Sequence, residues 1–212
     1  MRAGSSATAV TADGELAGHC AIFRSDSGSQ SAEIGQAVVK PEFRGQGCLL
    51  GLTEFLINEA KSRGLIGLYV HAVTSHAFSQ RVATRLGFTA CAILLGHAPA
   101  SITFRGIKEE LAQRETFLLQ YKYLEKPGPL KLYAPSKHKD FIAKIYGNLG
   151  VSPQFEALGF FFAGILPGAS VGEALVLQYL NNVAIDYDSI ELHTEASREI
   201  LAYIKRQDPN CG

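Results

Sequence analysis

The sequence lacks an excess of charge of either sign. Its 20 Lys and Arg residues balance 20 Asp and Glu residues among 212 residues, and the pI is near 7.0. A dedicated nucleic-acid-binding domain usually shows a basic excess, so we do not expect nucleic acid as a partner. The balance leaves open the binding of one small anion at a local site.

Signals for a membrane or for secretion are also missing. The apolar stretch 158–166 is far shorter than the roughly 20 residues that span a bilayer, and Pro167 and Glu173 follow it. The segment 1–14 lacks the apolar core of a signal peptide. The four cysteines form no CxxC pair. We therefore predict a cytoplasmic protein with reduced thiols and no membrane contact.

Metal-binding spacings are absent as well. The six histidines show neither an HxH nor an HExxH pattern. His71 is expected on a strand and His76 at the start of a helix, so a shared metal would require a coincidence of tertiary structure. We predict no metal. We expect Cys48 to be a small buried residue without a covalent role, although a helix N-terminus can activate a thiol.

What remains is globular composition, with 47% hydrophobic and 19% charged residues, enough for one large domain or two small ones. The pattern predicts a β-rich α/β fold. The expected strands are a hairpin over 8–24 that turns at Asp13-Gly14, then 32–39, 65–73, 89–96, 115–124, 130–134, 160–165, 174–180 and 190–193. The expected helices are 49–63, one capped by Thr74 or Ser75 with an apolar stripe at Phe78, Val82 and Leu86, a short one over 108–114, then 137–149 and 195–205.

Two parts of the chain follow the same order of features. Residues 75–99 and 136–167 each contain a capped helix, then a Leu-Gly pair, then a strand that ends in Gly-x-x-Pro. We interpret this echo as an internal repeat, with chance similarity of two helix–strand units as the alternative. The segment 125–129, with two prolines around a glycine, is the best linker. We therefore predict a first domain over 1–126 and a smaller half-domain over 127–212.

The most specific feature is a strand followed by the loop Arg44-Gly45-Gln46-Gly47 and a helix. A helix N-terminus offers unpaired backbone N–H groups and the positive end of the helix dipole. The two glycines let the backbone close around a pyrophosphate, and an arginine fork suits phosphate oxygens. No Gly-Lys-Ser/Thr and no GxGxxG follows, so this is neither a Walker loop nor a dinucleotide fingerprint. The alternative is a structural turn without a ligand.

This loop belongs to a motif that resembles the GNAT superfamily of N-acetyltransferases. The sequence VVxPxFRGQG at 38–47, followed by an amphipathic helix, is similar to the acetyl-CoA-binding motif of that family. The strand 65–73, the helix after it and Leu-Gly-Phe at 86–88 lie where the family has its second motif. The resemblance covers roughly residues 8–124. It implies a mixed, mostly antiparallel twisted sheet flanked by helices.

The resemblance implies acetyl-CoA as cosubstrate and assigns residues to it. The pantetheine arm would lie like an added strand beside the backbone of Val38 and Val39, where the sheet splays. Residues near His76, Ser79 and Gln80 would approach the thioester or the pantetheine. The pyrophosphate would be held by the backbone at Arg44, Gly45, Gln46, Gly47, Cys48 and Leu49.

Glu33 is the best candidate for catalysis. It lies eleven residues before Arg44, at the spacing where some histone-type members of the family have their general base. An amine nucleophile is protonated at neutral pH, so a carboxylate that takes its proton would promote attack. Ile34 should then face the opposite side of the strand. The alternative is a solvated strand carboxylate.

The sequence also departs from the family pattern. The family has a small residue two after the second loop glycine, where this chain has Leu49, which would crowd the phosphates or face the core. The asparagine expected at the start of the second motif is His76. The tyrosine that would protonate the departing thiolate is replaced by Ala83, so water becomes the expected proton donor. The second unit has a tyrosine in the corresponding place, Tyr146, for which a core position is the simpler explanation.

We therefore predict an acetyl-CoA-dependent N-acyltransferase that works by direct attack of a primary amine, either a small molecule or a protein lysine. The alternatives are a non-catalytic acyl-CoA-binding or regulatory module of a larger protein, and a purely structural interaction domain. In the family, one strand and two helices precede the hairpin and form a wall of the acceptor site. We expect either that residues 127–212 supply this wall, or that the chain is a piece of a longer protein. A homodimer contact is the other role considered for 127–212.

Overall fold

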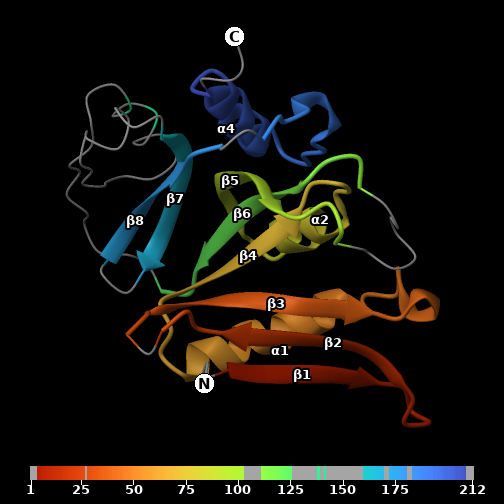
Figure 1. The fold of residues 1–212 in the computed structure, drawn as a ribbon. Helices are drawn as coiled ribbons and strands as arrows, with labels where there is room; N and C mark the ends of the chain where they lie inside the picture. The colour runs from red at the N-terminus through yellow and green to blue at the C-terminus, as the bar shows by residue number, and fades with distance from the viewer. Residues whose placement is uncertain are drawn as a thin grey trace.

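One eight-stranded sheet runs through the computed structural model (Figure 1), which describes residues 4–26, 28–102, 111–125, 138, 141, 160–169, 172–180 and 183–208. The strand order is β1-β2-β3-β4-β6-β5-β7-β8, and only β3 and β4 are parallel. This confirms the predicted mixed, mostly antiparallel sheet flanked by helices. The strands are β1 (Gly4–Val10), β2 (Leu16–Phe23), β3 (Ser31–Val39), β4 (Gly67–Val73), β5 (Thr89–Ala98), β6 (Glu115–Tyr123), β7 (Phe161–Ala169) and β8 (Gly172–Gln178). The helices in the described residues are α1 (Cys48–Ser62), α2 (Phe78–Arg85) and α4 (Glu195–Lys205).

The N-terminal hairpin forms as predicted. Gly14 takes a φ of 83°, and its N–H donates to the Thr11 carbonyl at the turn. Glycine reaches this left-handed region without the penalty that a Cβ brings. β2 then pairs with β3, and the alternating pattern turns Ile22 and Ile34 into the core. Glu33 therefore faces the other side of the sheet, as its spacing requires.

Helix α1 covers one face of β1, β2 and β3 (Figure 1). Its buried residues recur at the helical period and meet the strand residues that point to the same side. Leu56 and Ala60 are fully buried in this cluster, together with Ala32 and Leu68. The helix ends before Gly64, whose φ of 69° stops the helix as predicted.

Helix α2 follows β4, but two expectations about it were wrong. Its N-cap is Ala77, and no side chain caps it. This N-cap lies three residues after Thr74, whose hydroxyl and N–H bond to the Glu115 carboxylate, as does the Ser75 N–H. Its inward face also differs from the predicted stripe. Gln80 is fully buried, whereas Phe78 is 57% exposed. A buried amide is stable there because all its polar atoms have partners.

The second part of the chain extends the same sheet. β7 meets β5 through the pair Ala92 and Gly164, and β8 pairs with β7 along its length. The far end of β7 reaches the start of β3, where a Cβ on Gly168 would collide with Ser31 and Tyr121 (Figure 1). β7 therefore lies against the face of the sheet that bears Tyr121. The division into domains 1–126 and 127–212 stays a prediction.

Helix α4 packs against β5 and β7. Its N-terminus is a capping box, in which Thr194 and Ser197 bond each other's backbone. The predicted helix 195–205 is confirmed, but 190–193 forms no strand: Glu191 makes one backbone bond, to the Thr74 carbonyl. Residues 111–114 are likewise not helical. None of the described helices has the length and apolar character that crossing a membrane requires.

Several expectations fall on residues outside the described ranges. These are the helix predicted at 108–114 over its residues 108–110, the strand 130–134, most of the helix 137–149 with Tyr146, and the linker 125–129 beyond its first residue.

Candidate functional site

The site begins where β3 and β4 separate. Their parallel pairing is limited to Ser31–Glu33 with Gly67–Tyr69. Beyond Glu33, β3 stays paired with β2 on its other side, and β4 stays paired with β6. The two strands therefore diverge toward their C-terminal ends and leave backbone groups of β3 facing the gap (Figure 1). An extended chain of a ligand can bond such an edge.

A bulge in β3 accompanies the divergence. Gln36 has a φ of 54°, and the four β3 residues from Gly35 to Val38 lie opposite the three β2 residues from His19 to Ala21. An extra residue bends a strand and increases its twist. The sequence gives little sign of this bulge, because a non-glycine residue with positive φ is uncommon.

The glycine loop joins β3 to α1 at the open end of the gap. Pro41–Phe43 form a single 3-10 turn, and Gly45 and Gly47 take φ values of 75° and 84°. Gly47 is the N-cap of α1, and the Gly51 N–H makes the bond to its carbonyl. The amides of the first helical turn have no acceptor within the helix and point out of its N-terminus.

The loop is open above its two glycines. A Cβ placed on Gly45 or Gly47 would meet no atom within 4 Å, so the space above both residues is open. Gly45, Gln46 and Gly47 are exposed, and the Gln46 side chain bonds the Glu42 carbonyl within the turn. These residues fit an anion that approaches the backbone closely. The predicted pyrophosphate contact at 44–49 is thus compatible with the geometry.

The other residues predicted for this ligand lie around the same loop. Val38 is 58% exposed and Val39 is half-buried at the end of β3. Arg44 donates from Nε to the Val39 carbonyl at 3.1 Å, which ties the loop to the strand. The side chain of Cys48 faces Gly18 of β2, because a Cβ added to Gly18 would lie 2.9 Å from Cys48 Sγ. Only the backbone of Cys48 therefore faces the loop. Leu49 is half-buried.

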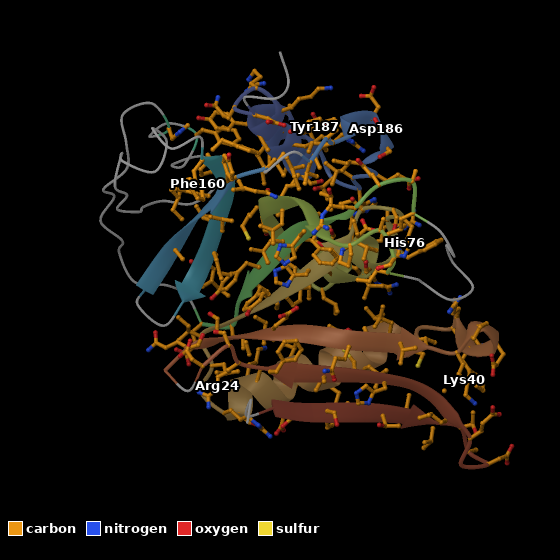
Figure 2. The ribbon with its side chains drawn as sticks, viewed as in Figure 1. Arg24, Lys40, His76, Phe160, Asp186 and Tyr187 are labelled. Atoms are coloured by element: carbon orange, nitrogen blue, oxygen red, sulfur yellow. The ribbon has the colours of Figure 1, made fainter. Side chains whose placement is uncertain are left out.

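The residues predicted on the far side of the gap follow β4. In Figure 2, His76 and Lys40, which precedes the loop, lie on the same side of the molecule. His76 accepts a bond from the Phe78 N–H at Nδ1, and the buried Ser79 hydroxyl has no hydrogen-bond partner among the described residues. Gln80 is not available to a ligand, because it bonds Val73, Glu191 and His193. The structure brings His76 and Ser79 to this end of the sheet and uses Gln80 for packing.

Glu33 stands at the apex of the gap and has a partner that sequence reasoning missed. His71 Nδ1 lies 2.8 Å from Glu33 Oε1, and the two side chains are 25% and 21% exposed. The pair forms because Glu33 is in register with Tyr69, and His71 follows Tyr69 on the same face of β4. The signal in the sequence was the histidine itself, two residues before the end of a predicted strand.

A second histidine stacks on the first. The rings of His71 and His97 are parallel within 8°, with centroids 6.2 Å apart, and Phe117 contacts both. Burial lowers the pKa of His97 from 6.5, and the charges of His71 and Arg114 lower it further against the opposing effect of Glu33. Arg114 itself is held by the Gly96 carbonyl. The cluster therefore favours a neutral imidazole at His97.

Glu115 is a buried acid that fixes the loop after β4. It is 3% exposed, and its Oε1 accepts bonds from the Thr74 N–H, the Thr74 hydroxyl and the Ser75 N–H. Its position at the start of a predicted strand gave no sign of this role. Because these bonds hold the segment that precedes His76, Glu115 determines where the far side of the gap lies.

The position of the missing tyrosine is closed to solvent. Ala83 is 4% exposed and packs in the cluster of α1, near Phe88 and Leu56. Among the described residues, no cluster of three or more His, Cys, Asp or Glu side chains could bind a metal. The thiols of Cys20 and Cys91 are buried, and burial raises the pKa of Cys20 to about 11 and that of Cys91 still further.

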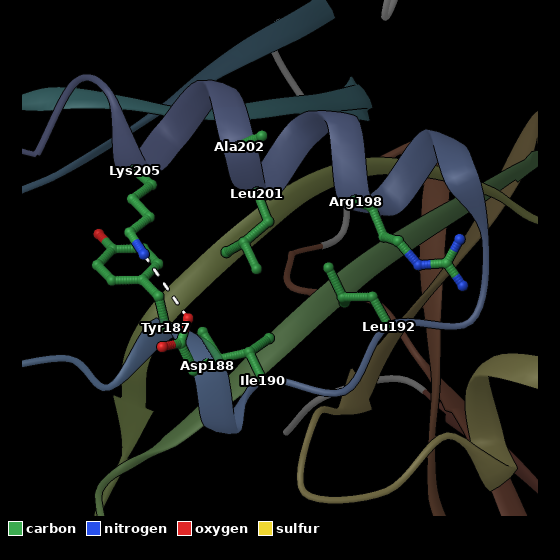
Figure 3. A pocket seen from close by; sticks show the side chains of 8 residues that line it. All are labelled: Tyr187, Asp188, Ile190, Leu192, Arg198, Leu201, Ala202 and Lys205. Carbon is green, nitrogen blue, oxygen red and sulfur yellow. Dashed lines mark ion pairs between the residues drawn. The ribbon is translucent and has the colours of Figure 1, made fainter.

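A pocket of about 260 Å³ lies elsewhere, between α4 and the segment that precedes it (Figure 3). Its walls include Leu192 and Leu201, and Lys205 pairs with Asp188 at 3.8 Å across it. None of the residues predicted for the site lines this pocket. It is separate from the gap between β3 and β4.

Comparisons with known proteins find a family that is similar to the first part of the chain. Residues 2–88 match the model of the acetyltransferase (GNAT) family, which confirms the resemblance and supports acyl transfer as the general class of function. No curated protein matches the sequence significantly.

Several solved acetyltransferase structures are similar to part of this chain. A nourseothricin acetyltransferase is 21% identical with a TM-score of 0.46, covering 57% of this chain and 66% of its own. The ribosomal-protein-S18-alanine N-acetyltransferase from Escherichia coli is 22% identical with a TM-score of 0.45, covering 56% and 68%. A spermidine/spermine N-acetyltransferase from Vibrio cholerae is 17% identical with a TM-score of 0.47, covering 57% and 68%. The chain thus spans about two thirds of the length of these structures.

Proposed function

We propose that this chain, whose residues 2–88 match the acetyltransferase (GNAT) family, is an acetyl-CoA-dependent N-acyltransferase that acetylates a primary amine. The observation that supports this most is the open glycine loop at the N-terminus of α1, placed at the mouth of the gap between β3 and β4. The glycine loop binds a pyrophosphate, and the gap between β3 and β4 offers the edge of β3 to the extended pantetheine arm.

The chain's own residues hold the cosubstrate, which supplies an acetyl group activated as a thioester. The backbone from Arg44 to Leu49 binds the pyrophosphate, and the edge of β3 at Val38 and Val39 binds the pantetheine arm. A backbone N–H of this strand donates to the thioester carbonyl. His76 and Ser79 border the arm on the side of β4. Positioning of the two reactants provides most of the rate enhancement.

Glu33 takes the proton of the acceptor. It is the carboxylate at the apex of the gap, and it is half-buried rather than solvated on an open strand. A base in this place converts the ammonium form of the acceptor into the attacking amine. The acceptor is a small amine or a protein lysine. Because Ala83 is buried and has no hydroxyl, water protonates the departing thiolate.

Calorimetry with acetyl-CoA and release of the CoA thiol in the presence of amines test this function together. We expect binding, and release that depends on the amine. Binding without release from any amine in a panel of diamines and lysine peptides would favour the second candidate, a non-catalytic acyl-CoA-binding module. The specific observation that favours this rival is Ala83, which closes the position of the expected acid. A purely structural domain would bind no acetyl-CoA.

The second part of the chain supplies a wall of the same site. β7 lies against the start of β3, where Gly168 approaches Ser31 and Tyr121. This is the face on which Glu33 and Tyr69 lie, and it is opposite to α1. We infer that residues 127–212 act as a half-domain that completes the cleft.

A further inference from the structure

Glu33 is not an isolated carboxylate, and its bonding partner has a definite place in the sheet. His71 Nδ1 lies 2.8 Å from Glu33 Oε1 across the apex of the gap between β3 and β4. One carboxylate oxygen is thus occupied by the imidazole, and Oε2 is the oxygen left to receive a proton. A bond of this kind fixes the rotamer of a base.

Three aromatic rings contact the ring of His71. Tyr69 contacts it edge-on at 5.6 Å, His97 stacks on it at 6.2 Å, and Phe117 contacts it at 5.9 Å. The titratable groups that face it are Glu33 from β3, His97 from β5 and Tyr69 from β4 itself, and Arg114, before β6, acts on His97. A neutral His97 leaves Glu33 as the group that determines the charge of the cluster next to His71.

We propose that His71 is a positioning residue for the acyl transfer, and that Glu33 and His71 act as one base whose proton-accepting power depends on the charge of His71. This inference rests on the proposed function of Glu33. With His71 neutral, Nδ1–H donates to Oε1 and the pair has a charge of −1. The acceptor's N–H bond breaks, its electron pair stays on nitrogen, and an O–H bond forms at Oε2. That proton later passes to solvent.

Protonation of His71 makes Glu33 a poorer acceptor of the proton from the amine. An imidazolium beside a carboxylate stabilises the ionised form of the carboxylate and so makes it a weaker base. A protonated His71 should therefore slow the transfer of a proton to Glu33, and the rate should fall when His71 gains a proton. Imidazole is the side chain that changes charge near neutral pH.

Two substitutions of His71 separate its hydrogen bond to Glu33 from the effect of its charge. His71→Asn keeps an N–H donor close to the position of Nδ1 but cannot be protonated, whereas His71→Phe keeps the ring and removes the donor. We expect His71→Phe to lower kcat on the order of tenfold or more at pH 8, with little change in KM for acetyl-CoA. We expect His71→Asn to keep most of the activity at pH 8 and to move the acidic limb of the kcat/KM profile by at least about one pH unit.

His19→Asn, on β2, is the matched control and should leave both the rate and the profile unchanged, since the ring of His19 lies 3.5 Å from the exposed Thr8 hydroxyl. The acceptor is the same in all variants, so its own ionisation cancels. An unchanged acidic limb in His71→Asn, or a kcat of His71→Phe within twofold of wild type, would overturn the inference while the proposed function stands. A wild-type protein that binds acetyl-CoA without turnover would overturn both.

Discussion

At the scale of single residues, Glu33 is the position on which the chemistry depends. Its neighbour Ile34 is 5% exposed in the core, while Glu33 faces the other side of β3 and meets His71. Alternation along a strand suffices to predict which of the two residues is buried. The contact with His71 could not be predicted, because it depends on the register between two strands that are 38 residues apart.

Replacement of Glu33 by Gln keeps the size of the side chain and removes the base. We expect kcat for the amine to fall by roughly 10²–10⁴-fold at neutral pH, because an amide cannot take the proton. The affinity for acetyl-CoA, measured by calorimetry, should change little. Glu59→Gln, on α1, is a suitable control, since Glu59 forms an ion pair with Arg63 one helical turn away and lies outside the proposed site. An unchanged pH–rate profile in Glu33→Gln would show that Glu33 is not the base.

The glycine loop allows a test with a matched backbone control. Gly45→Ala forces a side chain into a left-handed backbone, which costs about 1 kcal/mol of unfolding free energy. Gly64→Ala carries the same strain at the end of α1, and both sites have open space for the Cβ. We therefore expect similar losses of stability, but a several-fold weaker affinity for acetyl-CoA only in Gly45→Ala. Equal affinities in the two variants would contradict a phosphate contact at the loop.

His97 predicts a pH dependence of stability. Its pKa is lowered in the folded state, mainly by burial, so the folded protein binds this proton less well than the unfolded chain. The contribution of His97 to the free energy of unfolding is therefore present above pH 6.5. It is lost as the pH falls through the lowered pKa that His97 has in the folded protein. Urea unfolding from pH 7.5 to pH 5 should show a shallower decline for His97→Gln than for the wild type. If the free energy of unfolding declined equally with pH in His97→Gln and in the wild type, His97 would not have a lowered pKa in the folded protein.

At the scale of elements, the divergence of β3 and β4 makes the site. The sequence motif at 38–47 predicted a splayed sheet through the family resemblance, and the limited pairing at Ser31–Glu33 agrees with it. The bulge at Gln36 was not predictable, because nothing in the residue type signals a positive φ. The cap of α2 was predicted wrongly because the helix begins later, after a segment in which the Thr74 and Ser75 N–H groups bond to Oε1 of a buried acid, Glu115, about 40 residues further along the chain.

The bulge can be tested by residues that differ in their tolerance of positive φ. Gln36→Val places a β-branched residue in the left-handed region and should lower the unfolding free energy by roughly 1–2 kcal/mol. Gln36→Gly should be neutral or stabilising, since glycine adopts this conformation freely. Gln36 is exposed, so packing does not obscure the comparison. If both variants were equally stable, the strand would have no bulge at this residue.

At the scale of the whole molecule, β7 and α4 extend the first unit rather than stand apart from it. The sheet passes from β5 to β7 at Ala92 and Gly164, and the Gln178 side chain bonds both backbone groups of Leu95. The echo between the two parts predicted a second helix–strand unit. It could not predict where that unit attaches, because attachment depends on close backbone contact at glycines.

Gly164 therefore tests whether the two parts fold together. A Cβ there would collide with the backbone at Cys91 and Ala92, so Gly164→Ala should separate β7 from β5. We expect a lower Tm for the whole chain, measured by circular dichroism, and a larger loss than in Gly64→Ala. A wild-type Tm in Gly164→Ala would show that the contact of β7 with β5 does not stabilise the molecule.

The central claim is that the loop at Gly45 and Gly47 presents acetyl-CoA to an amine beside Glu33. Release of the CoA thiol, measured with and without a primary amine, tests this most directly. The account predicts release that requires the amine and that Glu33→Gln reduces, while acetyl-CoA still binds. An absence of acetyl-CoA binding by the wild-type protein would contradict it.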